Sequence, residues 1–154
     1  MAGLASLSIR TTTPSDRKDF PVDTVAPAVA GMPCVLLRIE GVSIFTIATV
    51  MYWRLGETWW LFAILFLAPD LSFFAYLGGA RVGAVTYNLL HTVTGPILLA
   101  LAGLFVPYEP ATAIALIWLA HCGADRALGY GLKYEAGFSF THLGRIGRAA
   151  DDKH

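Results

Sequence analysis

The sequence has little charge for its length. Of its 154 residues, 14% are charged and 56% are hydrophobic, whereas a soluble domain typically has about 25% charged and about 45–50% apolar residues. The formal net charge is zero, which argues against a nucleic-acid partner because such proteins carry basic patches. These features predict a single-domain membrane protein that binds no nucleic acid.

Cysteine pairs and a signal peptide are also missing. The two cysteines, Cys34 and Cys122, lie at or inside apolar runs and form no CxxC motif, so we interpret them as small buried hydrophobic residues. Residues 1–33 are polar, mixed in charge and interrupted by prolines, without the basic start and short apolar core of a signal peptide. We expect residues 1–33 to be a flexible cytoplasmic tail.

Long apolar runs are what the sequence does have. A spanning helix needs about 20 mostly apolar residues, and four segments qualify: 34–53, 58–77, 82–105 and 112–130. The short turns between them predict antiparallel neighbours, hence an all-α fold, an integral membrane up-down four-helix bundle over residues 34–132. We expect residues 133–154 to be a cytoplasmic tail folded on the bundle, as an ordered loop and then a short helix capped by Thr141.

Lysine and arginine are distributed unequally between the two ends of this bundle. Both tails and the second turn share one side, which holds Arg10, Arg17, Lys18, Arg81, Lys133, Arg145, Arg148 and Lys153. The other side offers only Arg54. The positive-inside rule therefore predicts a multi-pass protein of the bacterial inner membrane, with both termini cytoplasmic and membrane lipids around it. Assembly into a homo-oligomer or a larger membrane complex is compatible with the sequence and stays an open question.

Ionisable residues inside the predicted spans are few and unfavourable. Each costs about 2.5–3.5 kcal/mol or more at a lipid-facing helix centre, so we expect these residues to face the bundle interior. Counted from the cytoplasmic end of each span at about 1.5 Å per residue, several lie at a common depth of roughly 8–15 Å. These are Glu40, Asp70, His91, His121 and Asp125. Their shared depth predicts one polar site.

Two imidazoles with carboxylates are the ligands that Zn²⁺, Mn²⁺ or Fe²⁺ takes. We predict Asp70, His91, His121 and Asp125 as the ligands of such a divalent transition metal. His121 and Asp125 are four residues apart and share a helix face, and Pro69 predicts a kink beside Asp70. In a hydrolytic site the metal lowers the pKa of a bound water. Glu40 would be a bridging ligand or the general base, and Asp125 is the alternative base.

Other polar residues are predicted to support this site. Arg38 and Arg126 could neutralise the acids or bind an anionic headgroup, and Asn88 could orient a ligand or contact a substrate. His142, in the C-terminal tail, could reach back as a ligand or acid, or it could be a surface residue.

The same groups also have a non-catalytic interpretation. Glu40 with Arg38, or Asp125 with Arg126, could form ion pairs that fix helix register, as in a membrane subunit or scaffold with a buried polar network. That alternative predicts that His121→Ala mainly harms assembly, whereas the enzyme hypothesis predicts intact protein without metal. Haem ligation by two histidines is a third hypothesis, which a colourless preparation would exclude. A transporter is disfavoured, because four helices alone leave little room for a transport pathway unless the protein oligomerises.

Several motifs together resemble a known family. They are RIEG at 38–41, WWLFAILFLAPDLS at 59–72, YNLLHT at 87–92, WLAHCGADRALGYGLKY at 118–134 and THLGRIG at 141–147. Over roughly residues 34–148 the chain resembles the domain of unknown function 4260 family of small bacterial integral membrane proteins. The resemblance implies the four-helix membrane fold and brings no established activity.

A more distant resemblance is to the inner-membrane predicted metal-dependent hydrolases. In these proteins a Pro-Asp ends one helix, a His-Thr pair follows, and a later helix carries His and Asp four residues apart. The matching positions here are Asp70, His91 with Thr92, His121 and Asp125. Ser72 and Leu90 replace a second acid and a basic residue, so the resemblance gives no support for a second metal. The leading hypothesis is a metal-dependent hydrolase acting on a lipid or another amphiphile from the cytoplasmic leaflet.

Overall fold

The structure is a computed structural model that describes residues 28–105 and 109–146. Most of the predicted N-terminal tail, residues 1–27, lies outside the described residues, as does the end of the chain from residue 147. The described chain is mostly helical, as the sequence predicts. In chain order its elements are α1 (Met32–Leu55), α2 (Trp59–Phe66), the 3₁₀ helix η3 (Ala68–Gly78), α3 (Ala80–His91), α4 (Thr94–Phe105), α5 (Glu109–Leu128), β1 (Phe140–Thr141) and β2 (Gly144–Arg145).

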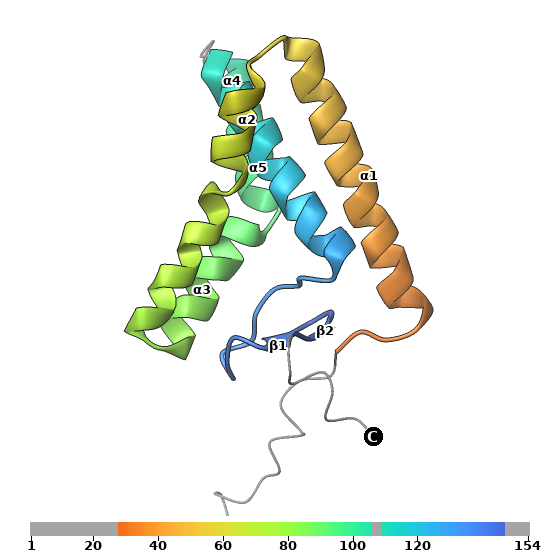
Figure 1. Cartoon of the computed structure of the whole chain (residues 1–154), viewed down its shortest axis with the longest axis vertical. Helices are drawn as coiled ribbons and strands as arrows, with labels where there is room; N and C mark the ends of the chain where they lie inside the picture. Colours follow the sequence, from red (N-terminus) through yellow and green to blue (C-terminus); the bar gives the residue numbers. More distant parts are fainter. Residues whose placement is uncertain (1–27, 106–108, 147–154) are drawn as a thin grey trace, which may run out of the picture.

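These helices form a bundle that runs alternately up and down (Figure 1). α1 is the first rod, α2 with η3 the second, α3 with α4 the third, and α5 the fourth. The described start of the chain and the C-terminal segment lie at the same end, the lower one in Figure 1. The predicted four-helix architecture is confirmed, and each predicted span matches one rod to within a few residues.

The second rod changes its helix type at Pro69. Proline has no backbone N–H, and its ring clashes with the carbonyl four residues earlier, so α2 ends at Phe66 and the chain continues as a tighter 3₁₀ helix. The N–H of Asp70 bonds the carbonyl of Leu67 at 3.2 Å, the three-residue spacing of that helix type. The predicted kink is thus an 11-residue 3₁₀ helix, and Asp70 lies in its first turn.

The third rod is broken after His91, whereas a continuous helix was predicted over residues 82–105. α3 and α4 meet at an angle of 44°. Thr92 is extended, with φ −82° and ψ 144°, and its hydroxyl lies 3.3 Å from that of Thr94. Pro96 lies in the first turn of α4, where proline is tolerated. The break makes His91 the last residue of α3.

The core lies where α5 packs between the other rods. Ala48 and Tyr52 of α1 are buried against Ala113, Ile117 and other small or apolar residues of α5. Lower down, the two helices approach so closely that a Cβ on Gly41 would lie 2.6 Å from the backbone nitrogen of Ala127. Close backbone approach through small residues is how membrane helices pack.

Two helical segments are long and apolar enough to cross a membrane. They are α1 and the combined α2–η3 rod, and the bent α3–α4 pair would be a third. Only 11% of the first two windows is buried, so their apolar side chains face outward. Within the described residues α5 does not meet the same criterion, although the sequence predicted a span there. Its second half carries His121, Asp125 and Arg126, which lower its hydropathy.

The C-terminal segment differs from the prediction. Gly129, with φ +93°, follows the end of α5, and the chain crosses the lower end of the bundle into a small hairpin of β1 and β2 (Figure 1). Residues 142–146 do not form the short helix that was predicted after Thr141, and residues 147–154, into which it would continue, lie outside the described residues. The Thr141 hydroxyl does not cap a helix but donates to the carbonyl of Gly144 at 2.7 Å, inside the hairpin turn.

Candidate metal centre

Four side chains from three different elements converge in the lower half of the bundle. Asp70 comes from η3, His91 from the end of α3, and His121 and Asp125 from successive turns of α5. One ligand atom from each side chain lies within 4.8 Å of all the others. Both histidines are buried, and both aspartates are partly buried. We call these four residues the His–Asp group.

The distances inside the His–Asp group are too long for direct hydrogen bonds. The Nε2 atom of His91 lies 3.6 Å from Asp70 Oδ1 and 3.6 Å from Asp125 Oδ2. The Nε2 atom of His121 lies 3.7 Å and 3.9 Å from the same two oxygens. Hydrogen bonds between nitrogen and oxygen span about 2.7–3.2 Å. Each carboxylate oxygen therefore faces both imidazoles across a gap.

The tautomer of His91 follows from its backbone contact. Its Nδ1 atom lies 2.9 Å from the carbonyl oxygen of Tyr87. A carbonyl can only accept a hydrogen bond, so Nδ1 carries the proton and donates it. Nε2 of the neutral ring then points its lone pair at the two carboxylates, which is how a metal-ligating histidine is oriented.

Three of the four imidazole nitrogens are buried without a partner. They are Nε2 of His91 and both ring nitrogens of His121. A buried polar atom left without a hydrogen bond costs about 1–3 kcal/mol, so native proteins rarely keep several in one place. A cation between the imidazoles and the carboxylates would satisfy both Nε2 atoms at once.

The spacing fits a first-row metal ion. Tetrahedral zinc binds nitrogen and oxygen at about 2.0–2.1 Å, which puts neighbouring ligand atoms roughly 3.3–3.4 Å apart. The four imidazole–carboxylate separations of 3.6–3.9 Å are wider by a few tenths of an ångström, and the ligand atoms of the whole group lie within 4.8 Å of one another. Small side-chain rotations would close that difference, so the arrangement could hold one ion.

Tyr87, which was not among the predicted site residues, belongs to this centre. Its hydroxyl donates to Asp125 Oδ2 at 3.0 Å, and its ring stacks on His91 with centroids 3.6 Å apart. The side chain is 1% exposed. Because Tyr87 lies four residues before His91 on α3, helical spacing was the signal that could have revealed it.

Asn88, Thr92 and His142 lie outside the His–Asp group. The Asn88 side chain clamps the backbone of Lys133: its amide donates to the Lys133 carbonyl at 2.8 Å, and its oxygen accepts from the Lys133 N–H at 2.7 Å. Thr92 is part of the break between α3 and α4. His142 Nδ1 accepts from the N–H of Leu132 at 2.8 Å, and burial lowers the pKa of this imidazole.

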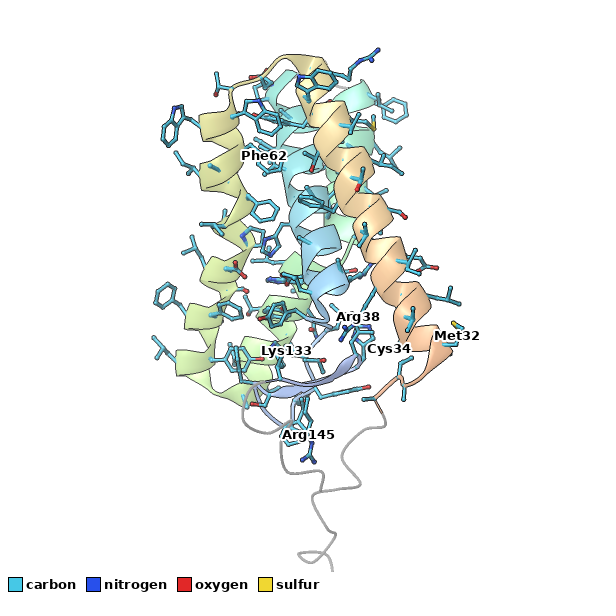
Figure 2. All side chains as sticks on the ribbon, turned by 45° about the vertical axis from the view of Figure 1, so that its right-hand side comes forward. Met32, Cys34, Arg38, Phe62, Lys133 and Arg145 are labelled. Atoms are coloured by element: carbon cyan, nitrogen blue, oxygen red, sulfur yellow. The ribbon has the colours of Figure 1, made fainter. Side chains whose placement is uncertain are left out.

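Glu40, Arg38 and Arg126 are not brought to the His–Asp group. Glu40 is exposed on α1. The Arg38 guanidinium lies against Gly129 at the end of α5, where a Cβ on that glycine would meet Nη2 at 2.6 Å (Figure 2). Arg126 packs its Cβ against Gly41 at the contact of α1 and α5. Both arginines therefore lie at the interface between α1 and the end of α5.

A cavity of about 680 Å³ opens beside the His–Asp group. This size is typical of a small-molecule site, for which about 300–1,000 Å³ is usual. Three members of the group, Lys133 and Ser139 contribute polar side chains to its wall, and most of the rest is aromatic or aliphatic. The apolar wall includes Phe66, Phe73, Leu128, Phe138 and Ile146.

Lys133 is a buried cation on the wall of this cavity. The residue is 4% exposed and lies near the hairpin at the lower end of the molecule (Figure 2). Its ammonium donates to the Phe138 carbonyl at 3.0 Å and lies 3.9 Å from the centroid of the Phe138 ring. Burial lowers the pKa of Lys133 to about 8, and the negative charge of Asp125 opposes this shift.

Comparison with curated proteins and with solved structures found no match. A family model described as a domain of unknown function, DUF4260, matches residues 34–146. The matched region contains every member of the His–Asp group, together with Tyr87 and Lys133. It covers well over half of the chain, and the chain therefore belongs to the DUF4260 family.

Proposed function

We propose that this protein is a multi-pass protein of the bacterial inner membrane that binds one divalent transition metal at the His–Asp group. The observation that carries the proposal is the meeting of two carboxylate oxygens and two imidazole Nε2 atoms at 3.6–3.9 Å, without hydrogen bonds between them. Both termini would be cytoplasmic, which puts the His–Asp group near the inner leaflet.

The donor set favours zinc, manganese or iron. Two imidazoles suit zinc, iron and copper, and carboxylates shift the preference toward zinc, manganese and iron. Cys122 does not join the donors: its sulfur lies 3.7 Å from the Leu90 carbonyl and 3.8 Å from the Thr92 carbonyl, toward which it is directed. We therefore propose a site with nitrogen and oxygen ligands alone.

We further propose that the metal serves hydrolysis of a lipid or another amphiphile. When bound, such a metal supplies a Lewis acid and lowers the pKa of water. Asp125 is anchored through one oxygen by Tyr87, and we assign it the task of taking the proton from the attacking water. The adjoining cavity is large and mostly apolar, as a substrate with an alkyl chain requires. The distant resemblance to predicted metal-dependent hydrolases favours the same chemistry.

A purely structural polar network accounts less well for these contacts. Such a network is stabilised by hydrogen bonds, so its imidazoles and carboxylates would lie about 2.7–3.0 Å apart. The separations inside the His–Asp group are longer, and His121 has no hydrogen-bond partner at either nitrogen. Buried polar groups without hydrogen bonds would destabilise such a scaffold.

Elemental analysis of the detergent-purified protein tests the proposal. Wild type supplied with zinc, manganese and iron should retain about one metal ion per chain after gel filtration, whereas His91→Gln and His121→Gln should lose it while keeping their helical circular dichroism. Glu40→Gln is the matched control, because it removes an intramembrane acid that lies outside the His–Asp group. A folded wild type that retains no transition metal would contradict the proposal.

A further inference from the structure

Lys133 has an unusual environment for a lysine side chain. It is almost completely buried, yet among the residues that the structure describes its ammonium forms no ion pair with a carboxylate. Its contacts are one carbonyl oxygen, the Phe138 ring, and the Tyr87 ring at 5.0 Å. An ammonium has three donor hydrogens, and one of them is directed at the Phe138 carbonyl.

The position of Lys133 is fixed by the fold. The Asn88 side chain holds both backbone groups of Lys133 through a pair of hydrogen bonds, and Thr141 pairs with it through an isolated β-bridge. Asn88 is three residues from His91 on α3, so the same helix positions the ammonium and one of the imidazoles. A backbone held on both sides is expected to keep the cation in place beside the cavity.

The cavity joins this cation to the His–Asp group. Lys133 shares the wall of the cavity with Asp70, His121 and Asp125. The remaining wall is formed mainly by apolar side chains from η3, α5 and the C-terminal segment. One compartment thus contains a buried cation, the proposed metal ligands and a large apolar surface.

We propose that the cavity binds an amphiphile with an anionic headgroup, a phosphate or a carboxylate, whose charge pairs with Lys133 while its alkyl chain lies along Phe66, Phe73 and Leu128. This inference rests on the proposed function for its reaction and names the substrate class of that site. A charged hydrogen bond in a desolvated site is stronger than a neutral one. A neutral headgroup would leave the buried ammonium without a counterion.

Binding of an anionic headgroup also explains why aromatic rings, and not a carboxylate, surround the Lys133 ammonium. Aromatic faces stabilise an ammonium without competing for an anion as a carboxylate would. The rings of Phe138 and Tyr87 provide such faces at 3.9 Å and 5.0 Å. The ammonium is thus held in place but not neutralised before the ligand arrives.

Binding to short-chain amphiphiles tests the inference. Isothermal titration calorimetry on the detergent-purified, metal-supplied protein would compare dihexanoyl phosphatidic acid, decanoate and the neutral dihexanoylglycerol, each below its micelle concentration. Lys133→Met keeps the length of the side chain and removes its charge. For whichever of the two anionic amphiphiles binds wild type more tightly, we expect the affinity of this variant to be lower by a factor of about ten or more. Its affinity for dihexanoylglycerol should be unchanged.

Two further variants make the result decisive. Arg81→Met is the matched control, since Arg81 is an exposed cation that pairs with Glu135 outside the cavity, and it should bind as wild type does. Lys133→Arg retains the charge and should keep the preference for an anion even if Lys133→Met folds poorly. Equal affinity of wild type for neutral and anionic amphiphiles, or unchanged anion binding by folded Lys133→Met, would overturn the inference.

The metal content of the same samples separates the two proposals. Metal retained without a preference for anions would refute the substrate class and leave the metal centre standing. Anion binding that depends on Lys133 in a protein without metal would support the binding site and refute the proposed enzyme.

Discussion

The hydroxyl of Tyr87 offers a sharp test of the metal centre, because it donates a hydrogen bond to a proposed ligand. Tyr87→Phe removes the donor that lies 3.0 Å from Asp125 Oδ2. That oxygen is the one facing His91 and His121 at 3.6 Å and 3.9 Å. The ring and its stacking on His91 remain, so packing changes little.

The size of the effect follows from the role of such contacts. Removing a hydrogen bond that orients a metal ligand typically lowers metal affinity by about 10–100-fold, which corresponds to about 1.4–2.8 kcal/mol. We expect zinc affinity to fall within this range, because Asp125 becomes free to rotate away from the two imidazoles. Competition with a chromophoric chelator in detergent would measure the change.

Tyr76→Phe is the control for this experiment. The Tyr76 hydroxyl is also buried, but it has no hydrogen-bond partner, so its removal should leave zinc affinity as in wild type. An affinity of Tyr87→Phe within twofold of wild type, or an equal loss in both variants, would refute the reasoning.

Three other predictions follow from the contacts around the site. Asn88→Ala removes both hydrogen bonds to the Lys133 backbone, so the C-terminal segment should be cleaved faster in limited proteolysis while the helices stay intact; unchanged cleavage would contradict the clamp. Anion affinity should be nearly full at pH 7 and fall as the pH rises through the Lys133 pKa of about 8, because the deprotonated amine cannot pair with an anion. Calorimetry at pH 7 and pH 9.5 checks this, and Lys133→Arg should remove the dependence. Gly41→Ala should abolish stable folding, because its Cβ would lie 2.6 Å from a backbone nitrogen of α5. The control Gly78→Ala meets only ordinary contacts at 3.5 Å and should melt as wild type does. A melting temperature of Gly41→Ala equal to that of wild type would contradict the close approach of the helices.

The helical rods were predictable because hydropathy runs report length and polarity directly. The sequence therefore indicated four rods and their alternation, and Pro69 indicated a break in the second. The break after His91 has a weaker signal, a proline in the first turn of α4. The hairpin after residue 139 was mistaken for a helix because Thr141 resembles an N-cap residue, whereas its hydroxyl bonds within the turn.

The common depth of the ionisable residues indicated the His–Asp group but not which face of its helix each residue occupies. Gly41, Ala48 and Tyr52 are the buried positions of α1, so Glu40, one residue away, is turned by about 100° from the side that meets α5. Depth alone included Glu40 with the other acids. The i, i+4 spacing of His121 and Asp125 fixed both depth and face, and that pair does belong to the group.

The residues that were missed depend on contacts distant in sequence. Lys133 reaches the cavity because Asn88, 45 positions earlier, clamps its backbone. Nothing in a hydropathy pattern encodes the path of an irregular segment. Tyr87 was accessible through helical spacing, but a tyrosine among apolar residues is common enough that spacing alone does not distinguish it from core packing.

X-ray absorption spectroscopy of the zinc-supplied, detergent-purified protein tests the central claim most directly. We predict a shell of nitrogen and oxygen donors at about 2.0–2.1 Å, with the outer-shell scattering of two imidazole rings. Sulfur at about 2.3 Å, which would implicate Cys122, or an oxygen shell without imidazole scattering would contradict a metal centre built from His91, His121 and the two aspartates.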